Sequence, residues 1–273
     1  MLSPPHEPVL DAALTRAFAG CLPGGRLAGP LRAYRSVPST QAIARAWAEA
    51  GAPEGAVVLA DHQTEGRGRR GRAWLAPPGT SLLVSVVLRP EVPVARWPEL
   101  PLAAGCAVAE ALEAEAGVSA ALKWPNDVLV GGRKLAGILA DGAAGAAGGP
   151  LVVLGIGVNV SQGEADWPPE LAGRARSLAG ETARVTRAGL LGAVLARLAA
   201  WYGVLLDEGF DPVRAAWRQR GLFGARVPLP AGEGTAVDLA PGGELVVRRE
   251  DGQTVLLVSA EDGRGRTVAA GRR

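Results

Sequence analysis

The sequence predicts an α/β (α+β) protein that ends in a small all-β module. Apolar strands and helical segments alternate as far as about residue 220, and short strands alternate with Gly- and Pro-rich turns from about Gly221 onward. A chain of 273 residues can bury a large core and hold one or two domains. We therefore expect an N-terminal extension (1–33), a main domain (34–220) and a C-terminal β domain (221–273).

Five segments have the apolar spacing and the boundary residues of helices. Ser39 and Thr40 would cap the second of them, and Gly51 would end it. Pro98 and Pro101 stand near the start of the third, where proline is tolerated. The predicted helices are residues 9–19, 41–50, 97–117, 187–206 and 211–220.

Runs of β-branched residues and leucine predict the strands. Gly131 and Gly132 would form a hairpin turn between two strands, and the Gly- and Ala-rich residues 141–149 are expected to be a mobile connection. The strands predicted in the main domain are residues 31–37, 56–62, 80–88, 121–123, 128–130, 134–140 and 151–160. Those predicted in the barrel-like C-terminal module are residues 225–229, 235–239, 244–249 and 254–259.

Composition argues against several classes of protein. The net charge of +2 gives no broad basic field for nucleic acid. The chain has no uninterrupted apolar run of about 18 residues for a membrane span, and its start lacks the features of a signal peptide. Cys21 and Cys106 lack the spacing of a metal site and are expected to be free, buried thiols. We expect a cytoplasmic protein with no DNA or membrane partner.

Lysine and asparagine are scarce and lie close together in the sequence. Of 29 basic residues only Lys123 and Lys134 are lysine, and Asn126 and Asn159 are the whole supply of asparagine. A position that keeps lysine in this background needs a compact ammonium group rather than a planar guanidinium. A position that keeps asparagine needs an amide that both donates and accepts hydrogen bonds. Residues 123–159 are therefore predicted to form half of an active site.

Residues 63–74 form an arginine- and glycine-rich loop that ends on Trp74. Backbone N–H groups and guanidinium groups in such a loop can surround an anion. The alternatives are a solvated basic turn or a nucleic-acid-binding segment. The position of the loop between two apolar strands favours an ordered anion site.

Two further segments contribute polar groups and an apolar floor. Asp127, at the end of a Lys-Trp-Pro-Asn-Asp run, is a candidate ligand for Mg²⁺, although the run could also be only a polar turn. Gly155 and Gly157 alternate along a buried strand, so a flat ring could lie on that face and Asn159 could read an edge such as that of adenine. Neither a Rossmann fingerprint nor a Walker A loop is present. The combination suits the activation of a carboxylate by ATP.

Together these motifs resemble the four signatures of biotin protein ligases, in the family's order and at its spacing. They are residues 66–72 with Trp74, residues 123–127, residues 134–138 and the Gly-x-Gly-x-Asn run at 155–159. The resemblance implies a central mixed sheet with flanking helices of the biotin/lipoate ligase type, followed by an SH3-like barrel. It also implies that the protein makes biotinyl-5′-AMP from biotin and ATP with Mg²⁺, and transfers biotin to a lysine of a biotin carboxyl carrier protein.

The resemblance implies a role for each motif residue. The biotin-binding residues would be Ser39, Thr40, Gln63, Gly66, Arg67, Arg69, Lys134, Gly137, Gly155 and Gly157. The ATP-binding residues would be Arg69, Arg72, Trp74, Lys123, Asn126 and Asn159. Lys134, Arg69 and Lys123 would be catalytic, Asp127 would bind the metal, and loop 64–73 would close over the ligands.

The chain departs from the family pattern at two places. Gln41 stands where the family often has asparagine, and we expect it to be peripheral. About 33 residues precede the main domain, too few for a winged helix-turn-helix, so we expect a ligase without the repressor domain.

Two other functions and two questions of assembly stay open at this point. A lipoate or octanoate ligase would share the fold, and an Arg/Gly nucleic-acid-binding regulator would belong to a different class. The β module could be a structural cap or could help to dock the carrier and ATP. The sequence leaves both a monomer and a homodimer open.

Overall fold

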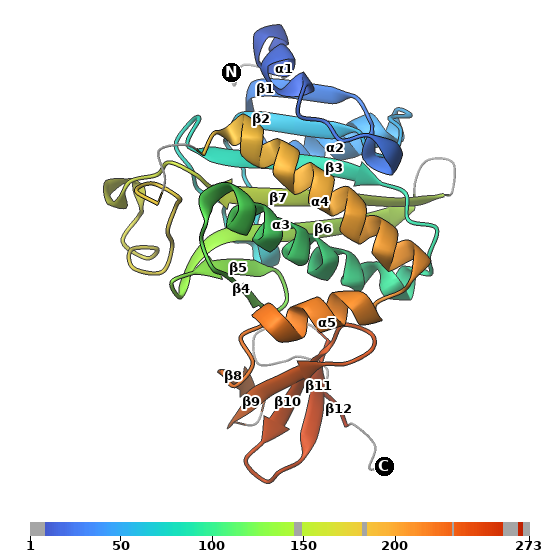
Figure 1. The fold of residues 1–273 in the computed structure, drawn as a ribbon, viewed down its shortest axis with the longest axis vertical. Coiled ribbons are helices and arrows are strands. Elements are labelled where there is room, and N and C mark those ends of the chain that lie inside the picture. The colour runs from blue at the N-terminus through green and yellow to red at the C-terminus, as the bar shows by residue number, and fades with distance from the viewer. Residues whose placement is uncertain (1–8, 145–148, 182–184, 231, 259–266, 270–273) are drawn as a thin grey trace, which may run out of the picture.

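The computed structural model describes residues 9–144, 149–181, 185–230, 232–258 and 267–269 (Figure 1). Within these residues the main domain contains a seven-stranded mixed sheet in the order β1-β2-β3-β7-β6-β5-β4. β1 and β2 are parallel, and the other neighbouring strands are antiparallel. The strands are β1 (Leu31–Val37), β2 (Val57–Gln63), β3 (Ser81–Leu88), β4 (Ala120–Lys123), β5 (Asp127–Val130), β6 (Arg133–Ala144) and β7 (Pro150–Asn159).

Helices cover the two faces of this sheet unequally. α3 and α4 pack against each other on one face, and α2, which connects β1 to β2, covers part of the other (Figure 1). The helices are α1 (Ala12–Ala19), α2 (Thr40–Glu49), α3 (Leu100–Ala116), α4 (Arg187–Asp207) and α5 (Asp211–Arg220). All five were predicted from the sequence, with ends that differ by at most three residues.

The two faces of β7 show how the sheet is divided. Val152 and Leu154 belong to the large core under α3 and α4, whereas Leu151 and Val153 belong to the smaller core under α2. This alternation is what a strand buried on both faces requires. β6 continues four residues beyond its predicted end, and β7 has the predicted length but begins one residue earlier. Their connection is therefore shorter than 141–149, and residues 145–148 of it lie outside the described residues.

The described part of the N-terminal extension packs on the main domain. Asp11 caps α1 by accepting a hydrogen bond from the backbone N–H of Leu14 at 2.7 Å. Phe18 and Leu27 are only 5% and 1% exposed and belong to the large core. The segment is therefore part of that core, and the domain boundary at residue 33 stays a prediction.

α4 is long and apolar enough to cross a membrane by length and composition alone. Leu191, Leu195 and Leu198 of this helix are buried in the large core, where α4 packs against α3. We therefore assign α4 to the core. Cys106 of α3 is buried in the same core, which raises its thiol pKa to about 12. Both cysteines are free thiols as predicted, but Cys21 is only partly buried.

The C-terminal module is a five-stranded antiparallel sheet in the described residues, in the order β12-β11-β10-β9-β8. Its strands are β8 (Arg226–Leu229), β9 (Gly232–Leu239), β10 (Leu245–Arg249), β11 (Thr254–Leu257) and β12 (Thr267–Ala269). The first four were predicted and β12 was not. The closure of the sheet into a barrel stays a prediction.

Side-chain hydrogen bonds help to attach this module to the main domain. The indole Nε1 of Trp124, within the Lys123–Asp127 run, donates a hydrogen bond to the backbone oxygen of Gly243 at 2.9 Å. Arg218 of α5 binds Asp238 of β9, and its hydrogen bonds lower the pKa of that carboxyl group. This ion pair therefore stabilises the contact at neutral pH and is lost as the pH falls through the lowered pKa.

Replacing Trp124 with phenylalanine should weaken the attachment of the module. The substitution removes the bond to Gly243, which is worth about 1 kcal/mol. Trp97→Phe is a matched control, because the buried Nε1 of Trp97 has no hydrogen-bond partner among the described residues. Urea unfolding should show Trp124→Phe to be the more destabilised variant by about 1 kcal/mol. Equal free energies of unfolding would show that this bond contributes nothing.

Candidate functional site

The candidate site lies on the face of the sheet that α2 covers only in part. Gly155 and Gly157 stand two residues apart on β7, and Gly137 of β6 is the register partner of Gly157. Without side chains, these three glycines leave a strip of bare backbone. The strip begins where α2 begins, because Gln41 in the first turn of the helix lies over Gly155. The structure thus brings the three predicted floor residues together.

A buried polar cluster borders this glycine strip. The backbone N–H and the hydroxyl of Thr40 both donate to Oε1 of Gln63, at 2.7 and 3.0 Å. Ser85, the register partner of Gly155, donates its hydroxyl proton to Oγ1 of Thr40 at 2.8 Å. Ser39 is also buried, but its side chain makes no capping hydrogen bond. Ser39 thus takes the predicted N-cap position without a capping bond from its side chain, and Gln63 accepts from the first amide of α2 instead.

A β-bulge brings Lys134 to the same face as the glycines. The register of β5 against β6 shifts between Val128 and Leu129, which leaves Leu135 of β6 as an extra residue. An extra residue reverses the alternation of side chains along a strand. Lys134 and Gly137, three residues apart, therefore share a face, and a Cβ added to Gly137 would lie 3.1 Å from Nζ of Lys134.

Both lysines of the chain lie beside one carboxylate. Nζ of Lys134 is 2.6 Å from Oδ1 of Asp127, and Lys123 is the register partner of Asp127 in the β4–β5 hairpin. Nζ of Lys134 also lies 5.6 Å from the centre of the Trp74 ring. Lys123 itself is exposed at the end of its strand. In the described part of the chain only Lys134 therefore forms an ion pair with Asp127, and the part of Lys123 in an active site stays a prediction.

The arginine-rich loop is folded back on itself and ends over the glycine strip. The backbone N–H of Trp74 donates to the oxygen of Gly66 at 2.8 Å, and that of Gly68 donates to the oxygen of Arg72 at 2.7 Å. Gly66 must lack a side chain, because a Cβ there would lie 2.6 Å from the backbone oxygen of Trp74. Arg67 and Arg72 are exposed.

Arg69 connects the loop to the Lys123–Asp127 run. Its Nη1 is 3.4 Å from Oδ1 of Asn126, a long hydrogen bond. Asn126 is fixed in turn by a bond from its amide nitrogen to the oxygen of Ile138 at 2.9 Å. The amide therefore accepts from one side of the site and donates to the other, which is the use expected for a retained asparagine.

The indole of Trp74 itself covers the floor. A Cβ added to Gly157 would lie 2.7 Å from Cζ2 of this ring, and one added to Gly137 would lie 3.0 Å from Cζ3. The sequence predicted that this floor would hold the ligand. In the structure a flat ring does lie there, but it belongs to the protein. Nε1 of Trp74 is buried without a hydrogen-bond partner among the described residues, which disfavours this position by about 1–3 kcal/mol.

Asn159 is placed differently from the other predicted residues. It is 4% exposed, its Oδ1 accepts a hydrogen bond from Gln162 at 3.0 Å, and its Nδ2 donates to the backbone oxygen of Arg176 at 3.1 Å. The hydroxyl of Ser81 lies 3.5 Å from the same Oδ1. In this conformation the amide holds the segment after β7, and its contact with adenine stays a prediction.

Asp127 is the one carboxylate of the site that was predicted to bind a metal ion. In the described residues no three His, Cys, Asp or Glu side chains form a group that could hold a metal ion. Asp127 is partly exposed and paired with Lys134. A single carboxylate still fits Mg²⁺ that arrives with a nucleotide, because Mg²⁺ is commonly held by one or two carboxylates together with phosphate oxygens and water.

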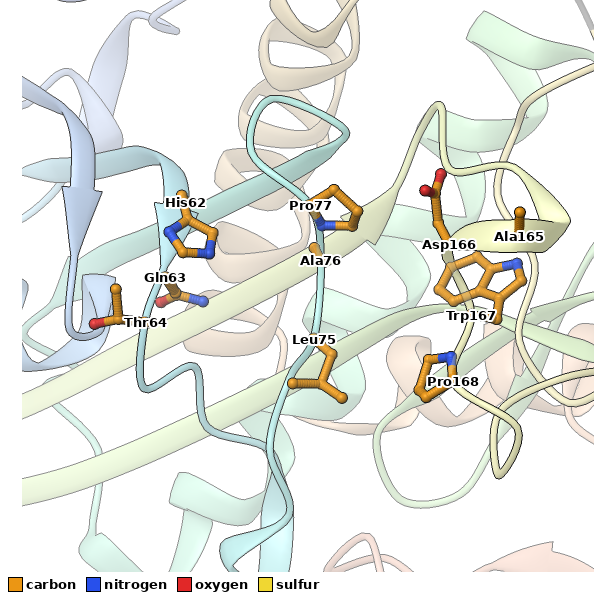
Figure 2. A pocket seen from close by; sticks show the side chains of 10 residues that line it. All are labelled: His62, Gln63, Thr64, Leu75, Ala76, Pro77, Ala165, Asp166, Trp167 and Pro168. Atoms are coloured by element: carbon orange, nitrogen blue, oxygen red, sulfur yellow. The ribbon is translucent and has the colours of Figure 1, made fainter.

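A cleft of about 700 Å³ opens beside the polar cluster. Figure 2 shows His62, Gln63 and Thr64 on one side of it, Leu75, Ala76 and Pro77 next to them, and Trp167 and Pro168 beyond. Gln63 belongs both to this cleft and to the predicted site, whereas Lys134 and the three glycines do not line the cleft.

Sequence reasoning missed several polar residues of the site. Ser81 and Ser85 are buried on β3, four residues apart and hence on one face of the strand. Two hydroxyls in an otherwise apolar strand were the signal that could have identified them. Gln41 was taken as peripheral, but it lies on the glycine strip and donates to the backbone oxygen of Leu139 at 3.0 Å.

Known proteins resemble this chain in sequence and in structure. Residues 33–159 match the Biotin/lipoate A/B protein ligase family. A biotin–[acetyl-CoA-carboxylase] ligase of Mycobacterium tuberculosis is 39% identical over 237 residues, which are 82% of this chain and 84% of that protein. A bifunctional ligase/repressor of Bacillus spizizenii is 36% identical over 229 residues, 83% of this chain and 68% of that protein.

A solved structure gives the same result for the fold. The biotin protein ligase from Aquifex aeolicus in complex with biotin and ATP superposes with a TM-score of 0.72 and is 31% identical. The match covers 85% of this chain and 96% of that one. The Mycobacterium relative and the solved structure are biotin ligases by name, and all three proteins align with most of this chain. This chain therefore belongs to the biotin/lipoate protein ligase family and, within it, to the biotin protein ligases.

Proposed function

We propose that the protein is an ATP-dependent biotin protein ligase. In the first step the carboxylate oxygen of biotin attacks the α-phosphorus of ATP, pyrophosphate leaves, and biotinyl-5′-AMP forms. In the second step the amine of a carrier lysine attacks the biotinyl carbonyl, AMP leaves, and the amine proton is released. The observation that carries the proposal is the meeting of Lys134, the glycine strip and the arginine loop at one place in a chain of this family.

The polar cluster is suited to the ring end of biotin. Ser85 donates its hydroxyl proton to Thr40, and Thr40 in turn donates two hydrogen bonds to Oε1 of Gln63, which fixes the orientation of the Gln63 amide. Its nitrogen makes none of these bonds, and we assign it to the ureido oxygen of biotin. Fixed donors of this kind lose little entropy when the ligand arrives.

Lys134 is suited to the carboxylate end. Its ammonium group is held by Asp127 at 2.6 Å and lies at the edge of the glycine strip. The mutual repulsion of a carboxylate and a triphosphate opposes their reaction, and an ammonium group between them would reduce it. Asp127 would be released from Lys134 at that point and could hold Mg²⁺ bound to ATP, which would neutralise phosphate charge.

The loop supplies the remaining cations. Arg69 is already positioned against Asn126, and Arg67 and Arg72 are exposed beside it, where they could contact the phosphates. A closed loop would also keep water away from the adenylate, a mixed anhydride that hydrolyses. The assignment of these arginines, of Lys123 and of Asn126 to ATP is part of the proposal.

The partner would be a biotin carboxyl carrier protein of a biotin-dependent carboxylase, and the site of action the cytoplasm. The names of the relatives support a carboxylase as acceptor. The two free thiols are consistent with a reducing compartment. We further propose that the protein does not bind DNA. Sedimentation would show whether it is a monomer or a homodimer.

Pyrophosphate exchange tests the proposal directly. Labelled pyrophosphate should enter ATP when biotin is present, and not with lipoate or octanoate. Mass spectrometry should then show one biotinyl group on a single lysine of an added carrier domain. Exchange that requires lipoate or octanoate would support the alternative ligase. A lack of exchange with all three acids would refute acid activation altogether.

Biotin should move Trp74, because the ligand and the indole need the same floor. We expect biotin to change the tryptophan fluorescence of the protein and Trp74→Phe to abolish most of that change. Trp201→Phe, on α4 at the opposite face of the sheet, should leave the change intact. A full fluorescence response in Trp74→Phe would show that Trp74 stays in place when biotin binds.

A further inference from the structure

We infer that Gln41 determines which acids the site accepts, by closing the glycine strip at the end away from Lys134. This inference rests on the proposed function and deepens it. Gln41 was expected to be peripheral, and the structure places it over the floor of the site.

The side chain of Gln41 lies directly on Gly155. A Cβ added to that glycine would lie 2.9 Å from Cδ of Gln41, 3.0 Å from Cγ and 3.2 Å from Nε2. All three distances are shorter than ordinary van der Waals contact, so the amide and its neighbouring methylene rest on the bare backbone. Gln41 therefore fills the part of the strip that Trp74 leaves uncovered.

Hydrogen bonds from two strands fix this position. Nε2 of Gln41 donates to the backbone oxygen of Leu139 on β6 at 3.0 Å and lies 3.4 Å from that of Val153 on β7. A side chain that is fixed at both its helix and its amide end resists displacement by a ligand. Trp74 differs, since its buried Nε1 has no partner among the described residues. A ligand would thus displace the indole more easily than Gln41.

The position of Gln41 identifies the ligand end that it would meet. Lys134 is next to Gly137 and Gly157, whereas Gly155 is roughly 7 Å further along β7 and is paired with Ser85. Ser85 holds Thr40, the residue next to Gln41 in α2. An acid with its carboxylate at Lys134 would therefore reach Gln41 with its ring, so Gln41 would limit the size of the ring and not the length of the tail.

Two biotin analogues separate these possibilities. Biotin sulfone carries two additional oxygens on the ring, and norbiotin has a tail one methylene shorter. The measurement is kcat/KM for each acid in pyrophosphate exchange, expressed relative to biotin. Gln41→Ala keeps a good helix former in the first turn of α2 and uncovers Gly155. Gln219→Ala is the matched control, because Gln219 is exposed on α5.

We expect Gln41→Ala to raise the ratio of kcat/KM for biotin sulfone to that for biotin about tenfold or more. One group that does not fit a pocket commonly lowers kcat/KM by about this factor. The norbiotin-to-biotin ratio should stay within about twofold. Gln41→Glu, of the same size but unable to donate to Leu139, should move the sulfone ratio in the same direction. Gln219→Ala should change neither ratio.

Three results would overturn the inference. They are an unchanged sulfone ratio in Gln41→Ala, an equal change in both ratios, and a variant that unfolds at the wild-type temperature but activates no acid. A folded but inactive variant would show that Gln41 is needed for activity itself and not for the choice between acids. A wild-type protein that fails to exchange with biotin would instead refute the proposed function, and that result is obtained before any variant is compared.

Discussion

Replacing Lys134 with arginine should slow the formation of biotinyl-5′-AMP by about a hundredfold or more, which corresponds to about 3 kcal/mol in the barrier. Arginine keeps the positive charge but replaces a compact ammonium with a planar fork. The ammonium is 2.6 Å from Asp127 and 5.6 Å from the centre of the Trp74 ring. A Cβ added to Gly137 would already lie 3.1 Å from both Cε and Nζ of Lys134. A guanidinium at this position would extend over the strip where the ligand must lie.

The chain offers a matched control one residue earlier. Arg133→Lys makes the reverse exchange on the same strand, where the side chain binds Glu164 at 2.9 Å at the surface. This variant should keep biotin-dependent pyrophosphate exchange within about twofold of the wild-type rate, because surface ion pairs contribute little. If Lys134→Arg exchanged pyrophosphate as fast as Arg133→Lys, the retention of lysine at 134 would have no catalytic reason.

Replacing Gly157 with alanine should raise the KM for biotin about tenfold or more, or about 1.4 kcal/mol. The added Cβ would stand on the floor, 2.7 and 2.8 Å from two atoms of the Trp74 ring in the present conformation. If Trp74 moves aside, the same methyl group meets the ligand instead. Either way the flat approach to the backbone is lost, whereas the extended strand geometry suits alanine.

A glycine with open space around it provides the control for this substitution. Gly203 lies within α4, and a Cβ added there meets no atom within 4 Å. Gly203→Ala should keep the KM for biotin and should stabilise the helix slightly, since alanine is the better helix former. An unchanged KM for biotin in Gly157→Ala, with its thermal unfolding unchanged, would mean that the ligand does not use the glycine strip.

Much of the fold could be predicted, because its signals are local. The buried strands have continuous apolar runs, and boundary residues such as Asp11 before α1 and Gly117 after α3 mark several helix ends. The site residues also came from local motifs, and the structure brings Lys134, Asp127 and the three glycines together. What brings them together is tertiary and was not visible in the motifs themselves.

Three features could not be read from the sequence, each for a physical reason. The bulge at Leu135 depends on the register of β5 against β6, and it determines that Lys134 faces the site. The position of Gln41 depends on carbonyl groups of two strands about a hundred residues away in the chain. The burial of Asn159 depends on Gln162 and on the backbone of Arg176, so the amide that the motif offered to a ligand is held by the protein.

The N-terminal segment and β12 illustrate weaker signals. Gly and Pro residues between 20 and 30 favoured a separate linker, yet Leu27 in this stretch is buried in the main core. β12 has three residues and pairs only with β11 in the described part of the chain. Strands this short are stabilised by pairing with a neighbour rather than by a pattern of their own.

The most direct test is a crystal structure of the protein with biotin and a non-hydrolysable ATP analogue. Our account predicts that Nζ of Lys134 leaves Asp127 and lies about 3 Å from the biotin carboxylate, next to the α-phosphate. It also predicts the fused rings of biotin between Gln63 and Gln41. A bound complex in which Lys134 still pairs with Asp127, while the acid binds elsewhere, would contradict it.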